Sequence, residues 1–144
     1  MRTPLEVFVS MMTNRNVCIM GGYDDLSKSF FEDLQKKQKK TIFLNFNNTN
    51  TKKKNVYNLK VYQLKKILHI LKSNKISEII FLGKINRPNL KNFKLDGEIE
   101  KFLPILQNAY KKGDDSLLKS ILNIFRTYGY IIKSPLDLST SFQL

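Results

Sequence analysis

Three short apolar runs constrain the fold of this chain more than any other feature. They occupy Asn16 to Met20, Thr41 to Phe46 and Glu78 to Leu82, and each stops at a glycine or at polar residues. Their inner stretches "CIM", "IFL" and "IIFL" are continuously apolar, which is typical of parallel strands that are buried on both faces. The sequence therefore predicts a sheet that is covered by helices on both sides.

Segments with apolar residues at helical spacing separate and follow these runs. We expect Leu26 on the buried side of the first helix, and Asp114 as the N-cap of the last, which ends at Gly129. Pro104 conflicts with the third helix, so that helix either kinks or begins close to Pro104. The predicted helices cover residues 26–39, 62–73, 99–111 and 114–128.

Two weaker signals complete the predicted sheet. Val56 to Leu59 is either a short strand or an extended connection, and Tyr130 to Lys133 is a last strand. Alternating strands and helices indicate βαβ units with right-handed crossovers. The expected fold class is α/β: a three-layer, Rossmann-like, open and mainly parallel sheet with helices on both faces. Residues 16–138 form the domain, after an N-terminal extension over 1–15 and before a linker that starts at 139–144.

The charge and the reactive side chains restrict the function. The net charge is +13, which favours an anionic partner, although only four of the 25 basic residues are arginines and most lysines suit solvated faces. Cys18 lies in an apolar run, and His69, the single histidine, lies in a helical pattern. Neither residue has partners at metal-ligand or catalytic spacing, so we expect no catalytic residue of these types. The start of the chain lacks a signal-peptide cleavage pattern, so we expect an intracellular protein.

The topology predicts where a ligand would bind. In open parallel sheets, ligands lie beyond the carboxyl ends of the strands. The segments that leave this edge begin at Gly21, Asn45 and Gly83, and all three should converge there. Gly21 and Gly22 could offer backbone N–H groups to a phosphate or could form a plain turn, because no GxGxxG or Walker lysine is present.

Charged residues near the same edge are further candidates. Lys84 and Arg87 follow the most apolar strand, and a guanidinium binds phosphate through two parallel hydrogen bonds. The alternative is that Arg87 pairs with Asp96 or with the end of a helix. Asp114 and Asp115 either cap their helix or hold Mg²⁺ or a ligand hydroxyl, and the residues alone leave both alternatives open.

The motif series "EIIFLGKINRPNL", then Asp96, then "GDDSLLKSILNIFRTYGY" resembles the N-terminal domain of the LpxI-type UDP-2,3-diacylglucosamine pyrophosphatases. In that family an apolar strand runs into a G-K-x-x-R-P turn, and a G-D-D-x-L-L segment later opens a helix. The resemblance covers about 16–138. It places the substrate near a set of candidate residues: Gly21, Gly22, Gly83, Lys84, Arg87, Asp96, Asp114 and Asp115.

The resemblance implies a hydrolase of lipid A biosynthesis in Gram-negative bacteria, acting at the cytoplasmic face of the inner membrane. Its members cleave the pyrophosphate of UDP-2,3-diacylglucosamine to UMP and 2,3-diacylglucosamine 1-phosphate. A divalent metal of the Mg²⁺ type serves a catalytic carboxylate in their C-terminal domain. This chain stops near the linker, so we expect it to bind substrate or product lipid, with a separately encoded second half as a partner, and not to catalyse alone.

Two departures and two alternatives accompany this interpretation. The family's spaced first-loop glycines are replaced by "GGYDDLS", and Met11 or Met12 is an alternative start of the chain. A nucleic-acid-binding module would explain the charge, but the sequence shows no aromatic-basic ribonucleoprotein motif and no basic recognition helix. A stand-alone nucleotide-binding domain is the other alternative.

Overall fold

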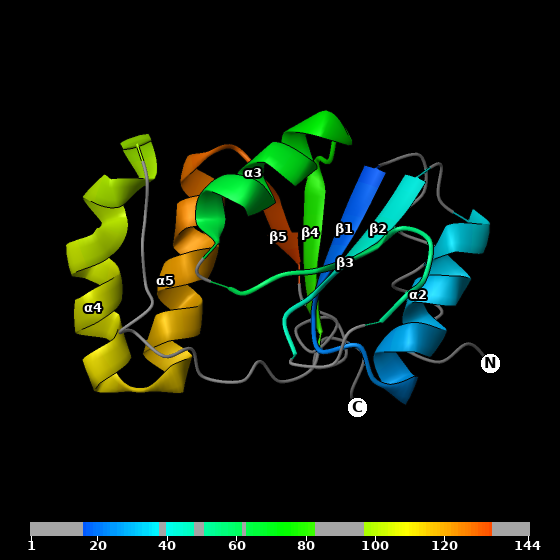
Figure 1. Ribbon diagram of the computed structural model, residues 1–144, viewed down its shortest axis with the longest axis horizontal. Helices are drawn as coiled ribbons and strands as arrows, with labels where there is room; N and C mark the ends of the chain where they lie inside the picture. Colours follow the sequence, from blue (N-terminus) through cyan, green and yellow to red (C-terminus); the bar gives the residue numbers. More distant parts are fainter. Residues whose placement is uncertain (1–15, 38–39, 48–50, 62, 83–96, 134–144) are drawn as a thin grey trace, which may run out of the picture.

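A computed structural model describes residues 16–37, 40–47, 51–61, 63–82 and 97–133, with backbone alone at 97–99 and 114–115 (Figure 1). Within these residues the sheet has five strands, all parallel, in the order β3-β2-β1-β4-β5. This confirms the predicted α/β class with an open parallel sheet. The strands are β1 (Asn16–Gly21), β2 (Lys40–Asn45), β3 (Val56–Asn58), β4 (Glu78–Leu82) and β5 (Ile131–Lys133).

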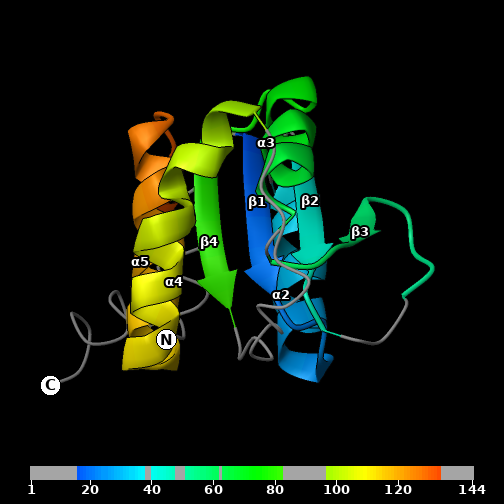
Figure 2. The ribbon, with the colours of Figure 1, turned by 60° about the vertical axis from the view of Figure 1, so that its left-hand side comes forward.

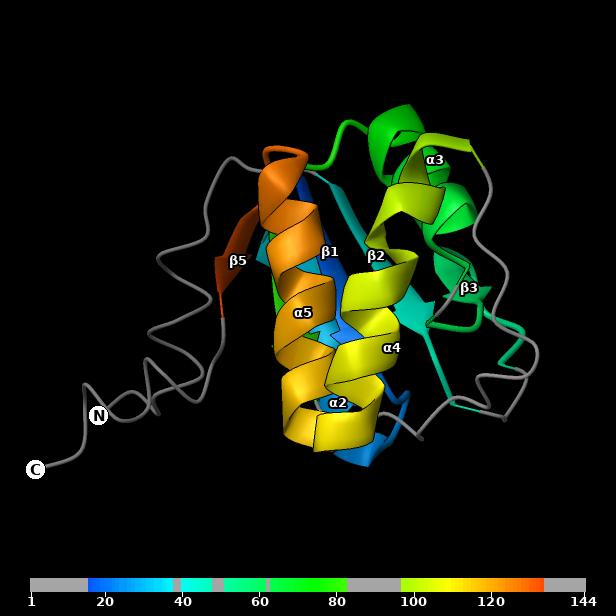
Figure 3. The same cartoon turned by 90° about the vertical axis from the view of Figure 1, so that its left-hand side faces the viewer.

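The helices cover both faces of the sheet, as predicted. One face is covered by α2, and the other by α3, α4 and α5, which lie together in Figure 3. Right-handed crossovers explain this division, because the chain moves one way from β1 to β2 and the other way from β3 to β4 and β5. The helices are α2 (Asp25–Lys37), α3 (Leu64–Ser73), α4 (Leu103–Lys112) and α5 (Asp114–Thr127), with the 3₁₀-helix η2 (Gly97–Phe102) before α4.

Strand β1 lies at the centre and is buried on both sides. Val17 and Ile19 point into the core beneath α2, whereas Cys18 and Met20 point into the core beneath the other three helices. All four side chains are fully buried. The continuous apolar run in the sequence therefore reflects two separate cores that share one strand.

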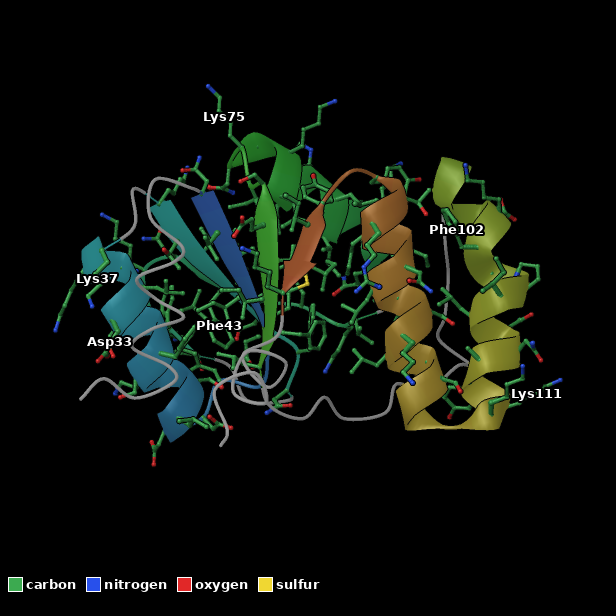
Figure 4. The ribbon with its side chains drawn as sticks, turned by 180° about the vertical axis from the view of Figure 1, so that it is seen from behind. Asp33, Lys37, Phe43, Lys75, Phe102 and Lys111 are labelled. Carbon is green, nitrogen blue, oxygen red and sulfur yellow. The ribbon has the colours of Figure 1, made fainter. Side chains whose placement is uncertain are left out.

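The first helix differs in one position from the prediction. Its buried stripe runs through Ser27, Phe30, Phe31 and Leu34, which follow the helical period. Leu26 lies one residue off this stripe and is 64% exposed, so its predicted burial is wrong. Figure 4 shows Phe43, on the sheet, under this helix.

The observed helix ends show where Pro104 lies in the third predicted helix and which residue is the N-cap of the last one. The 3₁₀-helix runs up to Phe102 and α4 starts at Leu103, so Pro104 stands in the first turn, where proline is tolerated, and no kink is needed. Helix α5 starts at Asp114 itself, so Gly113 takes the N-cap position and the prediction of Asp114 as N-cap is wrong. Gly129, with φ of 95°, follows the C-cap as predicted.

Substitutions on α2 test its placement on the sheet. Phe31→Ala should lower the free energy of unfolding by about 3–5 kcal/mol, because a fully buried ring would leave a cavity. Leu26→Ala, five residues earlier on the same helix, should change it by less than about 0.5 kcal/mol. Urea denaturation followed by circular dichroism measures both. Equal losses for the two variants would contradict the described orientation of α2.

Candidate functional site

The carboxyl edge of the sheet between β1 and β4 is the topological switch point of this fold. After β1 the chain turns toward β2, and after β4 it continues toward β5 on the opposite side. Connections that diverge in this way leave a crevice, which is where ligands bind in open α/β sheets. In Figure 2 the strand arrowheads mark this edge on the lower side of the sheet.

Two glycines bring the loops together at this edge. Gly21 has a φ of 152°, and a Cβ atom placed there would overlap the carbonyl oxygen of Leu82 at the end of β4. A Cβ on Gly22 would overlap the side-chain amide of Asn47, which follows β2. Packing against the backbone therefore requires glycine at position 21, whereas a side chain at position 22 would displace the Asn47 amide. Their predicted contact with a phosphate stays a prediction.

The start of α2 is already capped by the chain itself. The Asp24 carboxylate accepts a hydrogen bond from the Ser27 N–H at 2.8 Å, and the Asp24 carbonyl accepts one from Lys28 N–H at 2.8 Å. A carboxylate at a helix N-terminus occupies the position and supplies the charge that a bound phosphate would supply. This end of α2 therefore disfavours a second anion.

A buried amide holds three loops of the edge together. Asn45, the last residue of β2, is fully buried, and its Oδ1 accepts hydrogen bonds from the N–H groups of Tyr23 at 3.1 Å and Asn47 at 3.2 Å. Its Nδ2 donates to Oδ1 of Asn58 at 3.0 Å. The loop after β1, the loop after β2 and the end of β3 are thus linked through one side chain.

The backbone of Thr51 fixes the direction of this amide pair. Asn58 donates from Nδ2 to the Thr51 carbonyl at 3.0 Å and accepts from the Thr51 N–H at 3.1 Å. Asn58 must therefore present its oxygen to Asn45, which in turn must present its own oxygen to Tyr23 and Asn47. As a consequence the Tyr23 N–H is not available to a phosphate in this arrangement.

Tyr23 anchors the glycine loop on the α2 side. Its ring lies edge-on to Phe43, with centroids 5.0 Å apart, and to Phe31 at 6.4 Å. Nearby, Lys53 pairs with Glu32 of α2 at 3.0 Å, and their hydrogen bond raises the pKa of the lysine and lowers that of the carboxyl. The pair is exposed, so it adds little to stability, but it ties the loop before β3 to α2.

Asn47 presents an acceptor that the described residues leave unused. Its Oδ1 is buried, and no donor within the described part of the chain reaches it. The atom lies beside Gly22, at the switch-point edge. A buried amide oxygen without a donor is costly, so this atom is suited to a hydroxyl or N–H group of a ligand.

The start of α5 lies at the same edge. A helix that leads into a parallel strand runs antiparallel to it, so α5 begins where the strands end, as the turn between α4 and α5 in Figure 1 shows. This places the backbone of Asp114 and Asp115 at the carboxyl edge. Their side chains lie outside the described residues, and so do four other predicted site residues: Gly83, Lys84, Arg87 and Asp96. All these contacts stay predictions.

Reasoning from the sequence alone missed the residues that form the amide hydrogen bonds of this edge. Tyr23, Asn45, Asn47 and Asn58 carry its hydrogen bonds or its unused acceptor, yet none was selected as a site residue. A usable signal existed, because asparagine stands at the last position of both β2 and β3. Polar residues at the carboxyl ends of two adjacent parallel strands indicate a polar edge.

The described residues do not form a metal site. No group of three His, Cys, Asp or Glu side chains within them could hold a metal ion. Cys18 is fully buried in β1, and burial raises the pKa of its thiol, so it does not act as a nucleophile. His69 is exposed on α3, as expected for a surface histidine. A divalent metal is therefore not assigned to this part of the chain.

Comparison with known proteins adds a family to this geometry. The family model described as the LpxI N-terminal domain matches residues 16–142, which is most of the chain. A curated relative from Caulobacter vibrioides, UDP-2,3-diacylglucosamine pyrophosphatase LpxI, is 34% identical over 68 residues. That alignment covers 47% of this chain and 24% of the relative.

Substitution of Asn45 tests the amide network. Asn45→Leu should lower the free energy of unfolding by about 3 kcal/mol, because it leaves the partly buried N–H groups of Tyr23 and Asn47 without their acceptor and removes the hydrogen bond to Asn58. The control is Asn123→Leu, which removes an exposed hydrogen bond to Arg126 and should cost less than about 0.5 kcal/mol. Chemical denaturation of both variants measures the difference. A loss near that of the control would show that Asn45 does not hold the three loops.

Proposed function

The chain belongs to the LpxI N-terminal domain family, and on that premise we propose that it supplies the substrate-binding half of a UDP-2,3-diacylglucosamine pyrophosphatase. The proposed reaction adds water across the pyrophosphate bond and yields UMP and 2,3-diacylglucosamine 1-phosphate. It is a step of lipid A biosynthesis. The observation that carries the proposal is the family match over residues 16–142, on a sheet with an open switch point.

The proposed substrate explains several features of the edge. A pyrophosphate is anionic, and the chain carries a net charge of +13. We place Lys84 and Arg87 beside it, because they follow β4 at the switch point and Arg87 can bind a phosphate through two hydrogen bonds. The unused amide oxygen of Asn47 suits a sugar hydroxyl or the imide N–H of uracil.

Residues at the start of α5 complete the proposed site. The N-cap position there is held by Gly113, and no side chain caps the helix. Because Asp114 and Asp115 are the first two residues of α5, we propose that they accept hydrogen bonds from hydroxyl groups of the substrate and that the pyrophosphate binds elsewhere at this edge. Asp96, Asp114 and Asp115 are proposed to orient the substrate, and Gly21, Gly22 and Gly83 to let it approach the backbone.

Catalysis is assigned to the second domain that the family resemblance implies, on the same polypeptide or on another. That domain would hold the divalent metal of the Mg²⁺ type and the catalytic carboxylate, since the described residues here gather no metal-binding group. The described residues bind and position the substrate in this proposal and carry out no proton transfer.

The place of action follows from the substrate. A diacylated sugar nucleotide resides at a membrane, so we propose that the protein works at the cytoplasmic face of the inner membrane of a Gram-negative cell. None of the described helices is long and apolar enough to cross a membrane. We propose peripheral association with that face.

Binding of the substrate tests the proposal directly. We expect the protein to bind UDP-2,3-diacylglucosamine in detergent micelles, measured by isothermal titration calorimetry. Arg87→Ala should weaken binding about 10- to 100-fold, as expected for loss of charged hydrogen bonds to a phosphate.

The matched control is Arg126→Ala. This exposed arginine lies in the last turn of α5, at the opposite end of the helix from the proposed site, so its removal should leave affinity within about twofold. Absence of binding to the substrate and to its lipid product, even with the second domain of the Caulobacter relative added, would reject the proposed function. Binding of UMP without any contribution from the lipid would favour a stand-alone nucleotide-binding domain.

An assay of turnover tests whether the catalytic group lies on this chain or on the proposed second domain. The chain alone, with substrate and Mg²⁺, should release no UMP above background in a chromatographic assay. Addition of the second domain of the relative should restore release. Release of UMP by the chain alone, abolished by Arg87→Ala, would show that the catalytic group lies on this chain.

A further inference from the structure

The charged residues of this chain are unevenly distributed. Residues 34–77 contain no Asp or Glu, yet they contain 12 lysines and the single histidine. This stretch runs from the end of α2 through β2, β3 and α3 to the residue before β4. Any surface built from it alone is therefore cationic.

Helix α3 presents such a surface along its whole length. Leu64, Ile67 and Leu71 pack into the core at helical spacing. Lysines therefore occupy the solvent side of the helix and the turn that follows it. The exposed set that we call the α3 face consists of Lys65, Lys66, Lys72 and Lys75.

The α3 face has no acidic partner within the described part of the chain. The ion pairs between described residues, Lys53 with Glu32 and Lys133 with Glu78, include none of its lysines. The positive charge of this face is therefore available to attract an anionic partner from outside the chain.

Helix α2 provides the internal contrast. Its exposed lysines alternate with Asp25, Glu32 and Asp33, which balance their charge. In Figure 4 Asp33 and Lys37 lie on the same outer side of α2, whereas Lys75 points away from the molecule beyond α3. The solvent sides of α2 and α3 thus differ in charge although both carry lysines.

We propose that the α3 face binds the surface of an anionic phospholipid bilayer. The inference rests on the proposed function, because an acylated substrate would be drawn from such a bilayer. The first turn of α3 follows β3 at the carboxyl edge of the sheet, so Lys65 and Lys66 lie at the same edge as the candidate site. Binding through this face would bring the site toward the membrane.

The side chains favour a bilayer over a nucleic acid. The exposed side of α3 has no arginine to bind phosphates through paired hydrogen bonds, and apart from His69 it has no ring on which a base could stack. It also offers no large apolar side chain for insertion, since those that the described residues expose, Leu26, Ile105 and Ile131, lie on other elements. Attraction would be electrostatic and sensitive to salt.

Sedimentation with vesicles tests the proposal. The protein should bind vesicles of phosphatidylcholine and phosphatidylglycerol in equal parts at about 0.1 M salt, and should lose most of this binding at about 0.5 M. It should not bind phosphatidylcholine alone. Each lysine near an anionic bilayer is worth roughly a fivefold gain, so removal of the face should lower the partition coefficient on the order of 100-fold. The variant changes four residues together: Lys65→Gln, Lys66→Gln, Lys72→Gln and Lys75→Gln.

A second variant with the same net charge separates the face from the total charge. It should lower the partition coefficient by less than about threefold, because three of its lysines lie on α2, on the other face of the sheet, and the fourth is the first residue of β2, at the edge opposite the start of α3. Its four changes are Lys28→Gln, Lys36→Gln, Lys37→Gln and Lys40→Gln. Equal losses in both variants would overturn the assignment to α3.

Two further outcomes are decisive. Binding to single-stranded RNA, lost in the α3 variant, together with no vesicle binding by the parent, would replace the bilayer by a nucleic acid. Failure on vesicles with intact binding of UDP-2,3-diacylglucosamine in micelles would reject the membrane face and leave the proposed function standing. Circular dichroism of both variants confirms that they fold, since every changed side chain is exposed.

Discussion

Burial of β1 on both faces is the constraint on which the rest of the structure depends. Alternate side chains of one strand enter two different cores, so helices must cover the sheet on both sides. The strand also needs a neighbour on each edge, which it finds in β2 and β4. Because the chain leaves β1 and β4 in opposite directions, the same arrangement produces the switch point. The candidate site is thus a consequence of how the central strand is buried.

The polar groups at the switch point show how much of that edge is used by the protein itself. Glycine loops in nucleotide-binding folds expose N–H groups to phosphate. Here the N–H groups of Tyr23 and Asn47 are taken by Asn45, and the N-terminus of α2 is capped by Asp24. An anionic ligand at this edge would therefore find its donors away from the loop after β1. Helices α3 and α5 also begin at this edge, and the N-cap of α5 is a glycine.

The fold was largely predictable because its main signals are local. Continuous apolar runs identified β1, β2 and β4, and apolar spacing identified each helix to within a few residues. Leu26 was misplaced because sequence spacing alone does not tell which of two adjacent residues, Leu26 or Ser27, faces the sheet. Asn45 and Asn58 were missed as a pair for a different reason. Their contact depends on the register between β2 and β3, which is set by tertiary packing and not by either segment.

The positive charge on the solvent side of α3 is required neither by the fold nor by the candidate site. A parallel sheet needs only the apolar side of α3, so the residues on its outer side are free to vary without cost to the core. Carboxylates on that side would form pairs with Lys65, Lys66 and Lys72 at the spacing of one turn and would modestly stabilise the helix. Their absence over 34–77 leaves like charges close together, which is a small destabilisation of the isolated domain. A solvated surface gains nothing from this arrangement, whereas contact with an anionic surface would offset the repulsion, which is the physical reason to look for that contact on α3.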